Sequence, residues 1–216
     1  MPSRAMVIVG GGTSNRFGAD KLMVDVEGRP LIAHTIDAVA GHVDVCVVVC
    51  RAGITETVAK LRDDVTVTPG GASRTLSEMA GLAALGGEVD LIGIHDAARP
   101  AVGAVMIERL FSVAESVGGA VPLVSYDRLI LDRRTHQPVP GLHGAQTPQV
   151  FRGSDLMAAY VRAAQAGFEG HDTVEVMQHF SDVRVAGVPG DEGNVKVTYP
   201  RDLDRIRKSL SGSSRT

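Results

Sequence analysis

The alternation of uniformly apolar runs with stretches of helical periodicity most constrains the fold of this chain. The run VDVCVVVC, residues 43–50, is almost entirely apolar and rich in β-branched residues, which is typical of a strand buried on both faces. The preceding stretch, residues 30–41, has apolar residues at helical spacing and ends at Gly41. Because apolar strands separated by helices form sheets with both faces covered, we predict an α/β fold with a doubly wound, mostly parallel sheet.

The same alternation continues along the rest of the chain. Further strands are predicted at residues 5–10, 65–71, 89–96, 119–124 and 182–190. Further helices are predicted at residues 54–63, 73–85, 104–118, 153–167 and 199–210, and Ser73 is a candidate N-cap of the second of these. Residues 125–146 break the pattern, because their apolar residues nearly alternate around a polar turn, which predicts a protruding β-hairpin arm. We therefore expect a single domain over residues 1–216, with the arm as an insertion.

Composition and charge narrow the class of protein. Hydrophobic residues make up 44% and charged residues 22% of the chain, which is the balance of a soluble globular domain. The net charge of −3 gives no positive field for a nucleic-acid backbone, so we expect no nucleic-acid partner. No run approaches the roughly 20 apolar residues of a membrane span, so we expect no membrane partner. The opening residues lack the apolar core of a secretory signal, and Cys46 and Cys50 are expected to be reduced core residues, so a cytoplasmic location is predicted.

The loop after the first predicted strand, within VIVGGGTSNRFGADKLM at residues 7–23, points to a phosphate ligand. It is not a dinucleotide fingerprint, because Asn15 stands where the third glycine belongs, and it is not a P-loop, because Lys21 follows Asp20. It does offer glycine amides that can approach a phosphate closely, with Arg16 and Lys21 as separate cations. Such cations stabilise the negative charge that gathers on an α-phosphate under attack. The alternative is a glycine turn with two solvated cations.

Three later segments also follow predicted strands, namely residues 69–74, 95–100 and 190–196. Ligands of open α/β sheets bind beyond the carboxyl ends of the strands, so these segments should converge with the first loop on one crevice. Asp96 emerges there from a buried strand, where one carboxylate can hold Mg²⁺ against triphosphate oxygens. The alternative is that Asp96 caps the following turn and pairs with Arg99. Its neighbour His95 is expected to be packed rather than catalytic.

Four motifs follow the glycine loop in the order GGASRTLSEMAGL, HDAARP, TPQVF and GNVKVTYPRDL. With these motifs in this order, nearly the whole chain resembles the 2-C-methyl-D-erythritol 4-phosphate cytidylyltransferase family of the non-mevalonate isoprenoid pathway. The resemblance implies an enzyme that joins CTP and this polyol phosphate into a CDP-polyol and releases pyrophosphate, with Mg²⁺ as cofactor. It also implies a Rossmann-like nucleotidyltransferase fold and a homodimer in which the arm clasps the second subunit. A homodimer is expected on physical grounds too. A protruding hairpin is only marginally stable unless it packs against another surface, and a second copy of the chain can provide that surface.

The resemblance also assigns roles to individual residues. Arg16 and Lys21 would stabilise the transition state, and Lys196 would hold the phosphate of the polyol for in-line attack. Nucleotide contacts are implied for Gly10, Gly11, Gly12, Gly71, Arg74, Ser77, Asp96 and Ala97, and Asp96 would also bind the metal. Acceptor contacts are implied for Arg128, Thr147 and Asp172. No general base is required, because a phosphate nucleophile is already anionic.

The chain departs from the family pattern in two places. Its first loop is more similar to that of the molybdenum-cofactor guanylyltransferases. In the arm, Arg128 replaces the family's threonine, and Val139 replaces an arginine that reaches the substrate phosphate. Two alternatives therefore stay open: a cytidylyltransferase for another polyol or sugar phosphate, such as ribitol 5-phosphate, and a non-catalytic nucleotide-binding homologue. Asp172 likewise has a second interpretation, as the N-cap of the helix that follows it.

Overall fold

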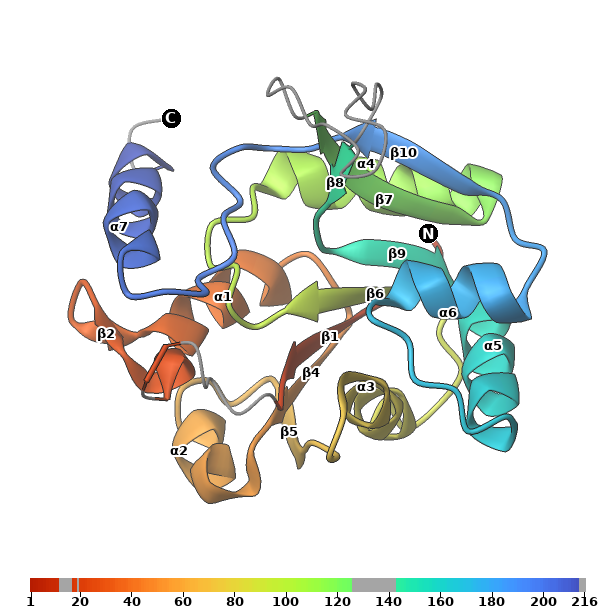
Figure 1. The fold of residues 1–216 in the computed structure, drawn as a ribbon, viewed down its shortest axis with the longest axis horizontal. Helices are drawn as coiled ribbons and strands as arrows, with labels where there is room; N and C mark the ends of the chain where they lie inside the picture. Colours follow the sequence, from red (N-terminus) through yellow and green to blue (C-terminus); the bar gives the residue numbers. More distant parts are fainter. Residues whose placement is uncertain (12–16, 19, 126–142, 214–216) are drawn as a thin grey trace, which may run out of the picture.

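The computed structural model describes residues 1–11, 17–18, 20–125 and 143–213, and its central element there is an eight-stranded sheet (Figure 1). Seven strands lie in the order β10-β7-β9-β6-β1-β4-β5, and β8 pairs with β7. Their bounds are β1 Arg4–Gly10, β4 Val45–Cys50, β5 Thr66–Pro69, β6 Leu91–Asp96, β7 Gly119–Ser125, β8 His143–Ala145, β9 Gln149–Arg152 and β10 Val185–Pro189. A separate two-stranded sheet is formed by β2 Asp25–Val26 and β3 Arg29–Pro30.

The pairing of the strands confirms the mostly parallel sheet. β1 lies between β4 and β6 and runs parallel to both, and the β4–β5 and β7–β10 pairs are also parallel. The antiparallel strands are β9, which lies between β6 and β7 and is antiparallel to each, and β8, which is antiparallel to β7. The parallel strands β1, β5 and β6 therefore end at the same edge of the sheet, as the sequence predicted for the crevice.

Helices cover both faces of the sheet, which is the doubly wound arrangement. Their bounds are α1 Leu31–Ala40, α2 Thr55–Ala59, α3 Arg74–Ala83, α4 Ala104–Val117, α5 Gly153–Gln165, α6 Thr173–Phe180 and α7 Asp202–Ser213. Along β1, Met6 and Ile8 pack into one apolar core with α1 and α4, whereas Val7 and Val9 pack into the other core with α3 and α5. Successive side chains of a strand point to opposite faces, so a strand between two layers of helices must be apolar throughout.

The two cysteines are core residues, as expected. Cys46 and Cys50 of β4 are both buried and free, and they pack in the same apolar core. Burial raises the pKa of Cys46 to about 12 and that of Cys50 to about 11, so both remain thiols at neutral pH. No helix among the described residues combines the length and the apolar character that a membrane span requires.

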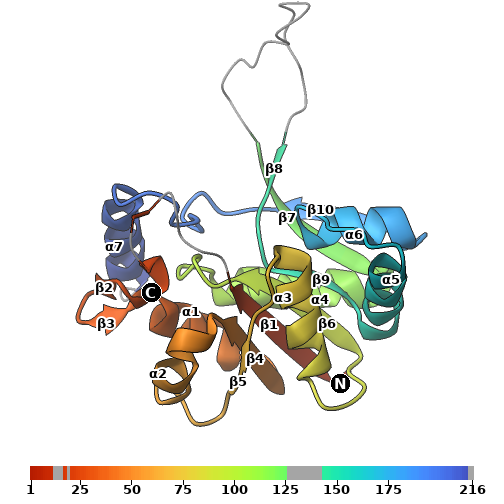
Figure 2. The same cartoon turned by 60° about the horizontal axis from the view of Figure 1, so that its bottom comes forward.

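The described part of the arm is a pair of antiparallel strands. β7 and β8 leave the body of the molecule together, in a register that runs from Leu123 opposite Ala145 to Ser125 opposite His143 (Figure 2). The remainder of the predicted arm, residues 126–142, lies outside the described residues, and with it Arg128 and Val139.

Apart from the two-residue strands β2 and β3, which were not predicted, two elements differ from the sequence prediction. β9 was not predicted, because four residues give too little periodicity and its pairing partners are distant in the chain. The helix predicted at residues 54–63 is shorter, since only Thr55–Ala59 is α-helical, preceded by a 3₁₀ turn, η2 Ala52–Ile54. Neither difference affects the edge of the sheet where the site residues gather.

Candidate active site

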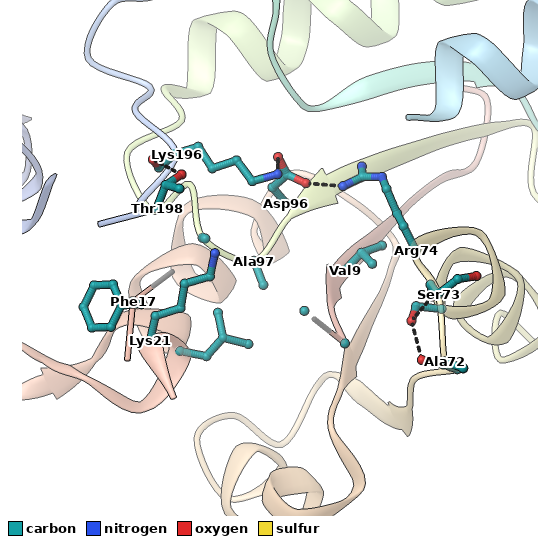
Figure 3. Close-up of a pocket in the computed structure, with 16 residues that line it drawn as sticks. Val9, Phe17, Lys21, Ala72, Ser73, Arg74, Asp96, Ala97, Lys196 and Thr198 are labelled. Atoms are coloured by element: carbon teal, nitrogen blue, oxygen red, sulfur yellow. Dashed lines mark hydrogen bonds and ion pairs between the residues drawn. The ribbon is translucent and has the colours of Figure 1, made fainter. Parts of the chain in front are cut away.

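A cavity of about 440 Å³ lies at the carboxyl ends of β1 and β6 (Figure 3). Its wall is formed by the ends of these two strands, the start of α3, the 3₁₀ turn η1 Lys21–Met23 and the segment that precedes α7. The predicted site residues that line it are Gly10, Gly11, Lys21, Gly71, Arg74, Ser77, Asp96, Ala97 and Lys196. Segments distant in the chain thus converge on one crevice, as predicted.

Asp96 is the electrostatic centre of this cavity. It ends β6, and it is the single carboxylate among the described residues that line the cavity. Its Oδ1 lies 2.7 Å from Nη1 of Arg74, and its Oδ2 lies 2.9 Å from Nζ of Lys196 and 3.2 Å from Nε of Arg99. Figure 3 shows Lys196 and Arg74 reaching Asp96 from opposite sides, with Lys21 pointing toward the same region. The ion pair with Arg99 that the alternative interpretation predicted is present, but it is one of three.

The ionisation of Asp96 follows from these partners. Burial by itself would raise the pKa of the carboxyl, but the nearby charges of Lys196, Arg74 and Arg99 outweigh burial and hold this pKa well below its usual range. Asp96 is therefore a carboxylate at any physiological pH. Among the described residues there is no cluster of three or more histidine, cysteine or acidic side chains that could hold a metal alone. A divalent cation at Asp96 would need further oxygen ligands, which nucleotide phosphates supply.

Lys21 is held in the cavity wall by its own turn. The side chain of Asp20 accepts a hydrogen bond from the backbone N–H of Leu22 and so caps η1. The same carboxylate pairs with Arg51, which follows β4. Nζ of Lys21 donates to the backbone carbonyl of Val197 at 3.1 Å, so this turn also contacts the segment that carries Lys196.

The segment that carries Lys196 is fixed by hydrogen bonds to the TPQ and HDAARP motifs of the sequence. Val197 N–H donates to the carbonyl of Ala98 at 2.8 Å, and the carbonyl of Asn194 accepts from Nη1 of Arg99 at 2.7 Å. The buried side chain of Asn194 donates to the carbonyl of Thr147 at 2.9 Å. Lys196 therefore reaches Asp96 from a loop that is anchored on both sides.

Two glycines bring the end of β1 close to its neighbours. A Cβ atom on Gly11 would lie 2.5 Å from Oγ of Ser77, and one on Gly10 would lie 2.6 Å from Cδ1 of Leu22 and 3.0 Å from Cβ of Ala97. Neither position has room for a side chain, so the backbone itself forms the cavity wall there. Such a wall can present backbone groups directly to a phosphate or a base.

α3 contributes both Arg74 and Ser77. The helix is capped by Ser73, as predicted, whose Oγ accepts from Leu76 N–H at 3.2 Å. The hydroxyl of Ser77 donates to the carbonyl of Ser73 at 2.8 Å, so its oxygen can still accept a hydrogen bond from a ligand in the cavity. The helix start thus places a hydroxyl and a guanidinium on one wall.

Glu78 is a functional candidate that the sequence analysis missed. It is fully buried in α3, and its Oε1 lies 2.9 Å from Nε of Arg74. Glutamate in an amphipathic helix is normally expected to be solvated, which is why it was overlooked. The signal that could have found it was its spacing, four residues after Arg74, which allows an ion pair on one helix face.

Two predicted acceptor residues do not line the cavity. Oγ1 of the buried Thr147 accepts from Asp96 N–H at 3.0 Å and also lies 3.0 Å from Nδ1 of His95. Asp172 caps α6, because its Oδ1 accepts from Glu175 N–H at 2.9 Å, so the cap interpretation is confirmed. Three other predicted residues, Gly12, Arg16 and Arg128, lie outside the described residues.

His95 is packed under the site rather than exposed in it. It is fully buried, and its Nε2 lies 3.0 Å from the carbonyl of Arg99. Burial lowers the pKa of His95 to about 4, so the ring is neutral at physiological pH. It therefore orients Thr147 and the turn after β6, and the expectation of a structural histidine is confirmed.

The chain matches known proteins over almost its whole length. The family model described as "IspD: 2-C-methyl-D-erythritol 4-phosphate cytidylyltransferase" matches residues 5–211. The 2-C-methyl-D-erythritol 4-phosphate cytidylyltransferase of Solibacter usitatus is 33% identical over 91% of this chain and 87% of its own length. That of Cereibacter sphaeroides KD131 is 36% identical over 96% of each chain.

A bifunctional enzyme IspD/IspF from Rhizorhabdus wittichii is 36% identical over 100% of this chain, which spans only 58% of that relative. Among solved structures, the 2-C-methyl-D-erythritol 4-phosphate cytidylyltransferase of Thermus thermophilus superposes with a TM-score of 0.80 at 26% identity, over 98% of this chain and 100% of that one. The 4-diphosphocytidyl-2C-methyl-D-erythritol synthase of Anaerococcus prevotii superposes with a TM-score of 0.85 at 21% identity, over 97% of this chain and 99% of that one, and so shares the fold.

Proposed function

Because the chain belongs to the 2-C-methyl-D-erythritol 4-phosphate cytidylyltransferase family, we propose that it joins CTP and 2-C-methyl-D-erythritol 4-phosphate into a CDP-polyol and pyrophosphate, a step of isoprenoid precursor synthesis. The observation that carries this proposal is the convergence of Lys196 and Arg74 on Asp96 in one cavity, beside Lys21. Cations from three separate segments around one carboxylate suit a triphosphate and a metal far better than they suit an uncharged ligand.

The reaction needs positioning and charge neutralisation more than proton transfer. An oxygen of the acceptor phosphate forms a bond to the α-phosphorus of CTP, and the bond from that phosphorus to the bridging oxygen breaks, so pyrophosphate leaves with the electron pair. Lys21 and Arg16 stabilise the charge on the α-phosphate, and Lys196 holds the incoming phosphate. The neutral, buried His95 has no role as a base, which agrees with a nucleophile that is already anionic.

Mg²⁺ is the proposed cofactor, and the residues present fit it. Asp96 is ionised and lies among cations that triphosphate oxygens would attract away from it. One carboxylate together with phosphate oxygens is a common ligand set for Mg²⁺, which keeps several of its waters. When bound, the ion would neutralise charge on the phosphates during transfer. Asp96 would hold the ion, while Lys21 and Lys196 would act on the two reacting phosphates.

The nucleotide and acceptor contacts are proposed as two groups. Gly10, Gly11, Gly12, Gly71, Arg74, Ser77 and Ala97 contact the nucleotide, and all of the described ones line the cavity. Arg128, Thr147 and Asp172 act on the acceptor side. Thr147 would act through the backbone of Asp96, which donates to its hydroxyl. We further propose one domain over residues 1–216 with an arm at 125–146, a homodimer formed through this arm, and a cytoplasmic location.

A second acceptor is favoured by two substitutions in the arm sequence. Val139 replaces the arginine with which this family reaches the acceptor phosphate, and Arg128 replaces a threonine. A cytidylyltransferase for ribitol 5-phosphate or a related polyol or sugar phosphate is therefore the alternative function. The nucleotide half of the reaction is the same in both cases.

The test is pyrophosphate release with a panel of substrates. Wild-type protein is assayed with Mg²⁺ and CTP or GTP, against 2-C-methyl-D-erythritol 4-phosphate and ribitol 5-phosphate. We expect release with CTP and the methylerythritol phosphate, loss of it with EDTA, and loss in Lys196→Ala. Glu108→Gln, which breaks the surface pair of Glu108 with Arg4, is the matched control and should keep full activity. Release only with ribitol 5-phosphate or only with GTP would contradict the proposal.

A further inference from the structure

Glu78 is a buried carboxylate with partners from three helices. Its Oε1 forms an ion pair with Nε of Arg74 in α3. The hydroxyl of Tyr160 in α5 donates to its Oε2 at 2.5 Å, and the hydroxyl of Thr173 in α6 donates to its Oε1 at 3.2 Å. Tyr160 and Thr173 are themselves buried. Removing a carboxylate from water is costly unless it is paired and hydrogen-bonded, as this one is.

The stability of the core does not by itself require this charge. Glu78 lies on the inward face of α3 together with Gly81 and Leu82, where it accepts hydrogen bonds from the buried hydroxyls of Tyr160 and Thr173. Replacing a buried ion pair by apolar residues of similar volume is often neutral or stabilising. A neutral side-chain oxygen could also accept these two hydrogen bonds, so the negative charge itself points to Arg74, which is its one charged partner among the described residues and which lines the cavity.

Arg74 is held between two carboxylates. Its Nε lies 2.9 Å from Oε1 of Glu78 in an ion pair that lacks hydrogen-bond geometry, and its Nη1 donates a hydrogen bond to Oδ1 of Asp96 at 2.7 Å, so opposite charges hold the guanidinium on two sides. Asp96 also pairs with Lys196 and Arg99, and one negative charge is thus shared by three cations. Glu78 supplies a second negative charge next to this group of cations, through its contact with Arg74.

Glu78 depends on Arg74 in return. Burial raises the pKa of the Glu78 carboxyl, and the positive charge of Arg74 acts against that rise, as do the hydrogen bonds from Tyr160 and Thr173. Burial and the neighbouring Glu78 raise the pKa of Tyr160 well above its usual value, so Tyr160 remains a hydrogen-bond donor. Glu78 and Arg74 therefore act as a unit, which makes their coupling measurable.

We propose that Glu78 is a positioning residue for nucleotide binding: its charge holds Arg74 at the cavity wall through their ion pair, so that the guanidinium stays in place for the anionic groups of the nucleotide. Phosphates that attract Arg74, or a cation that binds Asp96, would weaken the contact of Arg74 with that carboxylate and leave its ion pair with Glu78 in place. This inference rests on the proposed function, because it takes the nucleotide to be the ligand of Arg74.

The test is a double-mutant cycle on Glu78→Gln and Arg74→Gln, read as the dissociation constant of CTP and as kcat and KM. Glu78→Gln is nearly isosteric and can still accept from Tyr160. We expect it to weaken CTP binding about tenfold, which corresponds to about 1.4 kcal/mol and lies within the usual range of coupling between residues in contact. In the Arg74→Gln background the same change should have no further effect, since Glu78 acts through Arg74. Glu108→Gln, in an Arg–Glu pair outside the cavity, should bind CTP as wild type does.

The outcomes distinguish failure of the positioning role of Glu78 from failure of the proposed cytidylyltransferase reaction. Unchanged CTP binding in Glu78→Gln, or an equal loss with and without Arg74, would overturn the positioning role, because a general loss of packing adds independently of Arg74. Wild-type protein that binds CTP without releasing pyrophosphate would overturn the proposed reaction, and the binding cycle would still decide the role of Glu78. Wild-type protein that does not bind CTP would overturn both.

If Glu78→Gln does not fold, a second pair of variants tests the same proposal. Arg74→Met and Arg74→Met/Glu78→Met remove one or both charges and leave apolar side chains of similar length. Equal CTP affinity and equal kcat/KM in the two variants would support the positioning role. A further loss in the double variant, at an unchanged melting temperature, would overturn it.

Discussion

At the scale of single residues, the site depends on one carboxylate with an excess of cationic partners. Asp96 is buried at the end of β6, and its contacts with Arg74, Lys196 and Arg99 all lie between 2.7 and 3.2 Å. Those cations would repel one another without it. The same carboxylate is therefore both a proposed metal ligand and a structural centre, and its loss should affect stability as well as activity.

Asp96→Asn is expected to lower the free energy of unfolding at pH 7 by about 3 kcal/mol, as when one partner of a buried ion pair is removed. The folded-state pKa of Asp96 lies below its unfolded value, so the carboxylate contributes stability above an unfolded pKa of about 3.9, and this contribution is lost as the pH falls through the folded pKa. Urea unfolding at pH 7 and at decreasing pH below about 4 measures the difference between variant and wild type. A difference that stays constant into strong acid would contradict this account.

At the scale of elements, α3 determines the shape of the cavity because it packs very closely on the sheet. A Cβ atom on Gly81 would lie 2.2 Å from Cγ1 of Val7 in β1 and 2.7 Å from Cγ2 of Val49 in β4. The absence of a side chain at this position lets the helix approach both strands. Arg74, which begins the same helix, reaches Asp96 from that position.

Gly81→Ala is expected to destabilise the protein by about 2 kcal/mol, because the added methyl group must displace α3 or force Val7 and Val49 out of their rotamers. It should also weaken CTP binding, since α3 carries part of the cavity wall. Thermal and urea unfolding measure the first effect and calorimetric titration the second. Gly41→Ala is the matched control, because a Cβ atom there meets open space, and it should be neutral. Equal stability of the two variants would contradict the close-packing argument.

Two substitutions of Asp172 distinguish its role as the N-cap of α6 from its proposed role as an acceptor contact. Asp172→Ala should lose about 1 kcal/mol of stability because α6 loses its N-cap, whereas Asp172→Asn should keep the cap. The proposed acceptor role predicts in addition that Asp172→Asn raises the KM for the acceptor and leaves the KM for CTP unchanged. An unchanged acceptor KM would limit Asp172 to its role as a cap.

The elements show where sequence reasoning succeeds and where it stops. β1, β4 and β6 were predicted because a strand covered on both faces must be apolar at every position, and few other structures demand this. β9 was missed because Gln149–Arg152 is too short for a periodic signal and exists as a strand only through pairing with β6 and β7. Ser73 was identified as a cap because its position and chemistry are local properties.

At the scale of the whole molecule, the topology brings distant segments to one sheet edge. That edge could be predicted, because strands β1, β5 and β6 run parallel and their following loops must meet there. Lys196 could be assigned only by resemblance, since nothing local in its segment indicates that Thr147, Arg99 and Ala98 anchor it. Glu78 escaped both approaches, because its burial depends on α5 and α6, which come later in the chain.

The most direct test of the central claim is detection of the product by mass spectrometry after incubation of the protein with CTP, Mg²⁺ and 2-C-methyl-D-erythritol 4-phosphate. The account predicts that wild-type protein forms the CDP-polyol in an amount equal to the pyrophosphate released, and that Lys21→Ala forms at least about 100-fold less, as expected when a group that stabilises transition-state charge is removed. Absence of the CDP-polyol with the wild-type protein, or its formation by Lys21→Ala at the wild-type rate, would contradict the account.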